Sequence, residues 1–242
     1  MTPGRDARHL ALPQVGAEGQ ARIGAGKVLL IGVGGIGCPA AAYLASSGVG
    51  QLTVVDFDTV DATNLARQVL YAQGHIGELK ADVAAARLRK INPDIDVIAV
   101  NERLSGNALL DAVANADVVL DGSDNFATRF EVNRACVAAS RRLVSGSAIR
   151  FEGQLAVFGP DYSVSACYAC AYSEQDESLE DCAGNGVLAP IPGVIGTLMA
   201  VETLKFLAGI DTPAPAMRLY DGVAAEFRPL GIDKREHCPV CG

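Results

Sequence analysis

The feature that most constrains this chain is a glycine-rich turn between an apolar run and an alanine-rich segment. Residues 28–31 (V-L-L-I) form a continuous apolar run, which is typical of a strand buried on both faces. Gly32, Gly34 and Gly37 follow in a G-x-G-x-x-G spacing, and residues 39–46 then favour a helix. Glycines let the N–H groups at such a helix start approach an anion. The turn therefore predicts a nucleotide site, without saying which nucleotide binds.

Strand and helix patterns alternate over the rest of the first 147 residues. Strands are expected at residues 51–56, 95–100, 118–121 and 143–147, and helices at residues 77–91, 104–114 and 127–139. This alternation predicts a parallel sheet with helices on both faces. Residues 149–158 and 217–220, with Phe227 after them, favour antiparallel additions to the sheet. The expected fold class is a Rossmann-like, doubly wound α/β sheet whose parallel N-terminal half is continued by antiparallel strands.

The chain length of 242 residues suits a single domain. We expect an N-terminal arm at residues 1–24, either frayed or made of short packed helices. A nucleotide-binding half would follow at residues 25–147, and a second half at residues 148–242. Residues 195–207 are expected to form one long helix that ends at Gly209.

Charge and hydropathy argue against two classes of partner. The net charge of -8 disfavours a nucleic-acid-binding protein, which would usually be basic. The N-terminus shows no signal peptide, and the apolar stretches are strand-length or broken by polar residues. We therefore expect no membrane or nucleic-acid partner and a cytoplasmic location.

Acidic residues follow the expected strands at the edge where open sheets bind ligands. Asp56 ends the second strand, where a carboxylate would reach a ribose hydroxyl. Asp121 and Asp124 flank the turn after a later strand, and carboxylates near a polyphosphate are suited to Mg²⁺; alternatively, Asp124 is a helix N-cap. Arg67 and Lys80 are the basic residues placed nearest this crevice, although a solvated surface is the alternative for each.

Two C-x-x-C pairs, Cys167 with Cys170 and Cys238 with Cys241, predict a structural tetrathiolate zinc site. Their long separation suggests a clip that ties the C-terminus to the body. The alternative, a redox-active dithiol, is disfavoured because neither pair is expected to open a helix in a thioredoxin-like setting. The remaining cysteines are Cys38 and Cys136, expected in the core, and Cys182, a possible nucleophile or a bystander in an acidic loop.

Taken together, the motifs resemble the ThiF/MoeB/HesA family, the bacterial relatives of ubiquitin-activating enzymes. The resemblance spans nearly the whole chain, and its motifs occur in the family's order. They are G-V-G-G-I-G at residues 32–37, D-F-D at 56–58, N-L-A-R-Q at 64–68, Lys80, D-G-S-D-N at 121–125, C-Y-A-C at 167–170 and C-P-V-C-G at 238–242.

The resemblance implies an ATP-dependent adenylyltransferase acting on a ubiquitin-like sulfur carrier that ends in Gly-Gly, of the ThiS or MoaD type. The acyl-adenylate would serve sulfur transfer in thiamin or molybdopterin synthesis. The cofactors implied are ATP, Mg²⁺ and structural Zn²⁺, and residues 148–242 would bind the carrier through a half that includes a crossover loop.

The resemblance also implies roles for single residues. Gly34, Gly35, Asp56, Asn64, Arg67, Lys80, Asp124 and Asn125 would hold the nucleotide, with Asp124 on Mg²⁺. Cys182 would act in a later thiol step. Arg8 would reach into the site of a partner subunit, which implies a homodimer, although His9 stands where the family usually has glutamine.

Two other functions remain open from the sequence. An NAD-dependent oxidoreductase would also use the glycine turn and Asp56, but no histidine falls at a strand end. A carrier-binding relative with a degraded site would not need Arg67, Lys80 and Asp124 together. ATP–pyrophosphate exchange that depends on a carrier separates these functions.

Overall fold

The computed structural model describes residues 4–173, 186–210 and 216–242, and their strands form one sheet in the order β3-β2-β1-β4-β5-β6-β7-β8. The parallel strands are β1 (Lys27–Ile31), β2 (Gln51–Val55), β3 (Asp96–Val100), β4 (Val118–Asp121) and β5 (Arg142–Ile149). The antiparallel continuation is β6 (Glu152–Phe158), β7 (Ala216–Asp221) and β8 (Glu226–Leu230). The expected fold class is confirmed.

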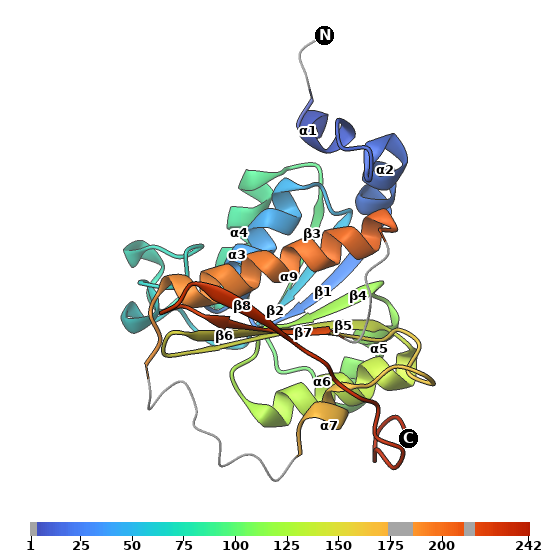
Figure 1. The fold of residues 1–242 in the computed structure, drawn as a ribbon. Helices are drawn as coiled ribbons and strands as arrows, with labels where there is room; N and C mark the ends of the chain where they lie inside the picture. The colour runs from blue at the N-terminus through green and yellow to red at the C-terminus, as the bar shows by residue number, and fades with distance from the viewer. Residues whose placement is uncertain (1–3, 174–185, 211–215) are drawn as a thin grey trace.

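Helices cover both faces of the sheet (Figure 1). One layer contains α2 (Gly16–Ala25), α3 (Gly37–Ser46), α4 (Lys80–Ile91) and α9 (Pro190–Ala208), and the other contains α5 (Gly106–Ala114), α6 (Phe126–Ala139) and α7 (Tyr168–Ala171). On β1, Leu30 packs in the first layer and Leu29 and Ile31 in the second. The apolar run is continuous because alternate side chains enter two separate cores.

Several element bounds differ from the sequence-based expectation. α4 begins three residues late, at Lys80, because Leu79 is extended. α5 begins at Gly106 because Ser105 is also extended. The arm holds α1 (Ala7–Leu10) and α2, and Ile23 of α2 is buried in the core, so the alternative of a frayed arm is wrong.

The long helix α9 lies across β5 and β6, where the sheet changes from parallel to antiparallel pairing, and against α2 and α3 (Figure 1). It ends at Gly209, as expected. Its length and composition alone would suit a membrane span, but 56% of that apolar window is buried inside the protein. Its contacts within the protein identify it as a core helix.

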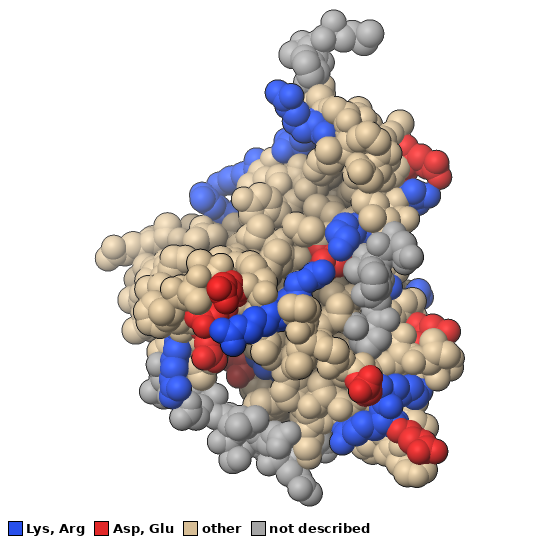
Figure 2. Space-filling view, viewed as in Figure 1, with Lys and Arg blue, Asp and Glu red and all other residues tan. Residues whose placement is uncertain are grey.

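Charged groups near α9 are paired rather than segregated. The buried Glu202 carboxylate accepts from Lys205 Nζ at 2.9 Å and from Arg218 Nη1 at 3.1 Å on β7. On the face drawn in Figure 2, acidic and basic side chains likewise lie beside one another. The pairing ties α9 to the antiparallel half of the sheet.

Candidate functional site

A pocket lies at the C-terminal ends of the parallel strands, where the glycine turn meets the turns after β2 and β4. Gly34 and Gly35 line it. Gly32 has a φ of +84°, which L side chains rarely adopt, and a Cβ at Gly37 would overlap the Gly32 carbonyl oxygen. A Cβ at Gly34, in contrast, would meet only Gln68 Nε2, 3.6 Å away. Gly32 and Gly37 therefore shape the turn, and Gly34 keeps space in the pocket free.

Asp56 follows β2 and links its loop to the glycine turn. One carboxylate oxygen accepts from Val33 N at 2.8 Å and the other from Asp58 N at 3.0 Å. Burial raises the pKa of this carboxyl, and the nearby Lys80 ammonium and these hydrogen bonds oppose the rise. Each oxygen can still accept another hydrogen bond, and Asp56 lines the pocket.

The basic side chains expected at the crevice do meet there. Lys80 is only 6% exposed, and its Nζ lies 2.9 Å from Asp58 Oδ2, so the solvated-surface alternative is wrong for this residue. Arg67 donates to Asn64 Oδ1 at 3.0 Å, and Gln68 donates to the same oxygen at 3.1 Å. Asn64 is the last residue of η1 (Ala62–Asn64), and its side chain thus orients both Arg67 and Gln68. Arg67 lines the pocket.

The two aspartates of D-G-S-D-N have different environments. Asp124 is exposed and lines the pocket, whereas Asp121 is only 1% exposed. The side chain that caps α6 belongs to Asn125, whose Oδ1 accepts from Thr128 N at 2.9 Å. The alternative of Asp124 as the cap is therefore wrong, and its carboxylate is available to a ligand.

Two buried polar atoms at the pocket have no hydrogen-bond partner, namely Gln68 Oε1 and Ser123 Oγ. Buried polar atoms are normally satisfied, so unpaired ones mark places where a ligand or water can bind. The Ser123 hydroxyl can donate to a phosphate oxygen, whereas Gln68 Oε1 can only accept. With the two cationic side chains and the exposed Asp124 carboxylate, the Ser123 hydroxyl suits a polyphosphate bearing a divalent metal.

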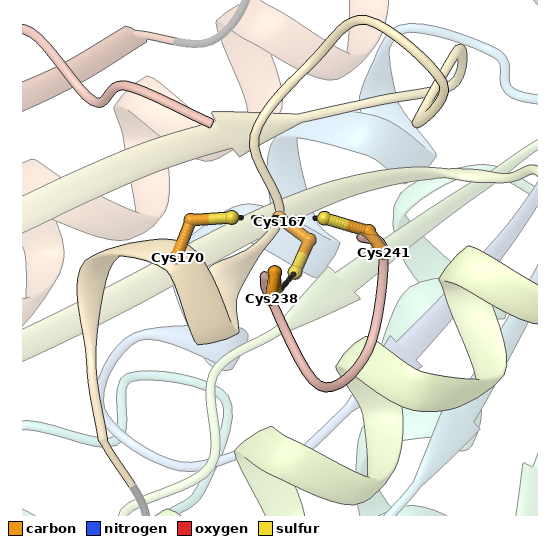
Figure 3. A group of neighbouring side chains, drawn as sticks. All are labelled: Cys167, Cys170, Cys238 and Cys241. Carbon is orange, nitrogen blue, oxygen red and sulfur yellow. Dashed lines mark hydrogen bonds between the residues drawn. The ribbon is translucent and has the colours of Figure 1, made fainter. Parts of the chain in front are cut away.

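The four C-x-x-C thiols converge where α7 meets the C-terminal segment, and their Sγ atoms all lie within 4.8 Å of one another (Figure 3). Cys167 Sγ lies 3.7 Å from Cys238 Sγ, and Cys170 Sγ lies 3.6 Å from Cys241 Sγ. Zn–S bonds of about 2.3 Å in a tetrahedron require S–S edges of about 3.8 Å, so the cluster fits zinc. Cys167 is the N-cap residue of the short helix α7, but its side chain makes no capping hydrogen bond, and its sulfur faces Cys238 of the other pair.

Backbone N–H groups favour a thiolate at one of these positions. Burial acts to raise the pKa of Cys238, but hydrogen bonds from the backbone at Cys241 and Val240, together with those from the Cys170 and Cys167 thiols, bring the pKa to about 7. Thiolate is the form that binds zinc. Cys38 and Cys136 are fully buried core residues, as expected.

The roles expected for Arg8, in the pocket of a partner subunit, and for Cys182 stay predictions. Arg8 is exposed on α1 and does not line the pocket of its own chain. Cys182 lies outside the described residues. The sequence interpretation missed Gln68, Arg103 and Arg129, which do line the pocket. Gln68 is part of the N-L-A-R-Q motif, and Arg129 lies five residues after Asp124. Their proximity to a motif could therefore have identified both as candidate pocket residues.

The fold and the site together define a protein with a Rossmann-like sheet, a pocket at its glycine turn and a cluster of four cysteine thiols. The family model described as "ThiF family" matches residues 7–240, and the chain belongs to this family.

Relatives and solved structures agree with this placement. The chain is 45% identical over 98% of its length, and 94% of the relative, to "Sulfur carrier protein ThiS adenylyltransferase" of Escherichia coli. It is 42% identical over 97% of its length, and 94% of the relative, to "Molybdopterin-synthase adenylyltransferase" of the same organism. A crystal structure of E. coli MccB with ATP superposes with a TM-score of 0.84 at 24% identity, covering 100% of this chain and 75% of that one, which shows the shared fold.

Proposed function

We propose that this protein is an adenylyltransferase that uses Mg²⁺ and ATP to activate the C-terminal Gly-Gly carboxylate of a ubiquitin-like sulfur carrier. The observation that carries the proposal is the convergence of Arg67, Lys80 and Asp124 on the pocket at the glycine turn. Identities of 45% and 42% to the two named adenylyltransferases support it. A ThiS-like or MoaD-like carrier, in thiamin or molybdopterin synthesis, matches those names.

The reaction requires positioning and charge neutralisation more than acid–base chemistry. The carrier carboxylate is already a nucleophile. One of its oxygens forms a bond to the α-phosphorus of ATP, and the bond from that phosphorus to the oxygen bridging the α- and β-phosphates breaks, which releases pyrophosphate. Lys80 and Arg67 would neutralise the phosphate oxygens, and Asp56 would bind the ribose. Asp124 would hold Mg²⁺, which when bound screens the charge on the leaving pyrophosphate.

The partners and later steps belong to the same proposal. Zn²⁺ on the four thiols would be structural, because all four positions of a tetrahedral site are then filled by protein. A homodimer would bring Arg8 of a second copy to the pocket, and Cys182 would act after adenylation. Residues 148–242 would bind the carrier, and the enzyme would work in the cytoplasm.

The alternative functions have less support. Among the described residues, no histidine lines the pocket, so an oxidoreductase would lack that proton carrier there. A degraded, non-catalytic relative would not need Lys80, Arg67 and Asp124 together. An assay of labelled pyrophosphate exchange into ATP tests the proposal. We expect exchange only when a Gly-Gly carrier is added. No exchange with any such carrier, together with tight NAD binding, would refute the proposal.

A further inference from the structure

Arg129 lines the pocket but has no part in the roles described so far. It lies in the first turns of α6, and its guanidinium reaches back over the start of that helix. Nε and Nη2 donate to the Ser123 carbonyl oxygen at 3.2 and 2.8 Å. This carbonyl belongs to the residue directly before Asp124. Arg129 therefore holds the turn that carries Asp124 from the helix side.

The same turn is fixed from the opposite side by contacts that do not involve Asp124. The Asp121 carboxylate accepts from Ser123 N at 3.0 Å. Gly122 packs so closely on the glycine turn that a Cβ at Gly32 would lie 3.0 Å from the Gly122 carbonyl oxygen. Asp124 itself is exposed, and its Oδ1 accepts from Asn125 Nδ2 at 3.5 Å. The position of the Asp124 carboxylate is thus set by its turn.

Arg129 also supplies charge that the turn requires. Asp121 is 1% exposed, and its Oδ2 has no hydrogen-bond partner. Burial raises the pKa of this carboxyl, and the Arg129 charge is the largest opposing influence. The guanidinium also lies over the Phe126 ring, 5.7 Å from its centroid. Arg129 is therefore engaged with the protein beneath the pocket.

We propose that Arg129 is a positioning residue that fixes the turn at residues 122–124 and so sets the Mg²⁺ affinity of Asp124. This inference rests on the proposed function, because it assigns Mg²⁺ to Asp124. Partners behind metal ligands commonly change metal affinity by about 10- to 100-fold when they are removed. A lysine would retain the charge near Asp121 but could not reproduce the two-nitrogen contact with the Ser123 carbonyl.

The test measures ATP binding by calorimetry at a series of Mg²⁺ concentrations and again with EDTA. It uses the zinc-loaded full chain as wild type, Arg129→Gln and Arg129→Lys. Arg134→Gln is the matched control, because Arg134 is an exposed arginine on the same helix and does not line the pocket. We expect the Mg²⁺ concentration that gives half of the full increase in ATP affinity to rise ~10-fold or more in Arg129→Gln and less in Arg129→Lys. In EDTA, the ATP affinity of both Arg129 variants should match that of wild type. Arg134→Gln should match wild type both with Mg²⁺ and with EDTA.

Two results would overturn the inference. One is an unchanged Mg²⁺ requirement in a folded Arg129→Gln protein, or in Arg129→Lys if the glutamine variant does not fold. The other is an equal loss of ATP affinity with and without Mg²⁺, which would mean that Arg129 contacts the phosphates directly. Failure of the proposed function gives a different result, because wild type itself would then show no carrier-dependent exchange of pyrophosphate into ATP, whatever Mg²⁺ concentration the Arg129 variants require.

Discussion

Lys80 Nζ lies 2.9 Å from Asp58 Oδ2, and the two side chains differ sharply in exposure, at 7% and 54%. The Lys80 backbone N–H also donates to the Asp58 carbonyl oxygen at 2.9 Å. The first residue of α4 is therefore tied twice to the loop after β2. A buried ammonium needs a counter-charge, and an exposed carboxylate can give up this partner to a phosphate at modest cost.

Replacing Lys80 should remove charge neutralisation while preserving much of the buried packing. We expect Lys80→Met to lower the rate of carrier-dependent ATP–pyrophosphate exchange ~100-fold or more. Asp58→Asn should have a much smaller effect, because it leaves the ammonium in place. Exchange rates for the two variants at saturating carrier check this; similar rates for Lys80→Met and wild type would contradict a role at the phosphates.

Gly34 and Gly37 should respond differently to an added methyl group. Gly34→Ala should leave the fold intact, because its Cβ meets only Gln68 Nε2, but it should weaken ATP binding by occupying the space where the backbone approaches the phosphates. Gly37→Ala should destabilise the fold, because its Cβ would overlap the Gly32 carbonyl. Thermal unfolding and ATP titration separate the two effects. Normal ATP affinity in Gly34→Ala would place the phosphates elsewhere.

The sequence predicted the fold well because each parallel strand carries its own local signal. Residues 28–31 are apolar throughout, and the structure shows them buried between two helix layers. Asp56 was found because it directly follows such a strand, and Asp124 because it lies in the turn after another. Strand ends meet at one edge of a parallel sheet, so chain position alone brings these residues together.

Other parts of the site depend on geometry that no local pattern encodes. Asn125 rather than Asp124 caps α6, and either residue type can do so. The role of Arg129 depends on the path of the turn at residues 122–124, and the burial of Lys80 depends on how α4 packs. Asn133, fully buried on α6, contacts Cys167 Sγ although it is distant from both C-x-x-C pairs in sequence.

Asp124 and its neighbour Asn125 should affect different properties. We expect Asp124→Asn to reduce Mg²⁺-dependent exchange ~100-fold or more, with little change in stability because the side chain is exposed. Asn125→Ala should lower the free energy of unfolding by about 1 kcal/mol, because it removes the helix cap. Exchange assays and urea unfolding of both variants check this. Near-normal exchange in Asp124→Asn would exclude its metal role.

Zinc bound to the four C-x-x-C thiols, as proposed, should stabilise the fold, and Asn133 should increase the affinity of this site for zinc. Asn133 Nδ2 lies 3.6 Å from Cys167 Sγ, and its Oδ1 accepts from Tyr168 N at 2.9 Å. Chelation should lower the melting temperature, and Asn133→Leu should weaken zinc affinity ~10-fold. Asn115→Ala, at an exposed helix end, is the control. Competition with a chromogenic chelator measures the affinity; unchanged zinc binding in Asn133→Leu would remove its supporting role.

Exchange of labelled pyrophosphate into ATP, with and without a ubiquitin-like carrier, tests the central proposal most directly. The purified protein should catalyse exchange with Mg²⁺ only when a carrier with a free C-terminal Gly-Gly is present, and removal of the last glycine should abolish it. This requirement follows because the carboxylate is the nucleophile and the pocket supplies phosphate and metal contacts. Exchange that is equally fast without any carrier, or absent with every Gly-Gly carrier of the same cell, would contradict the proposal.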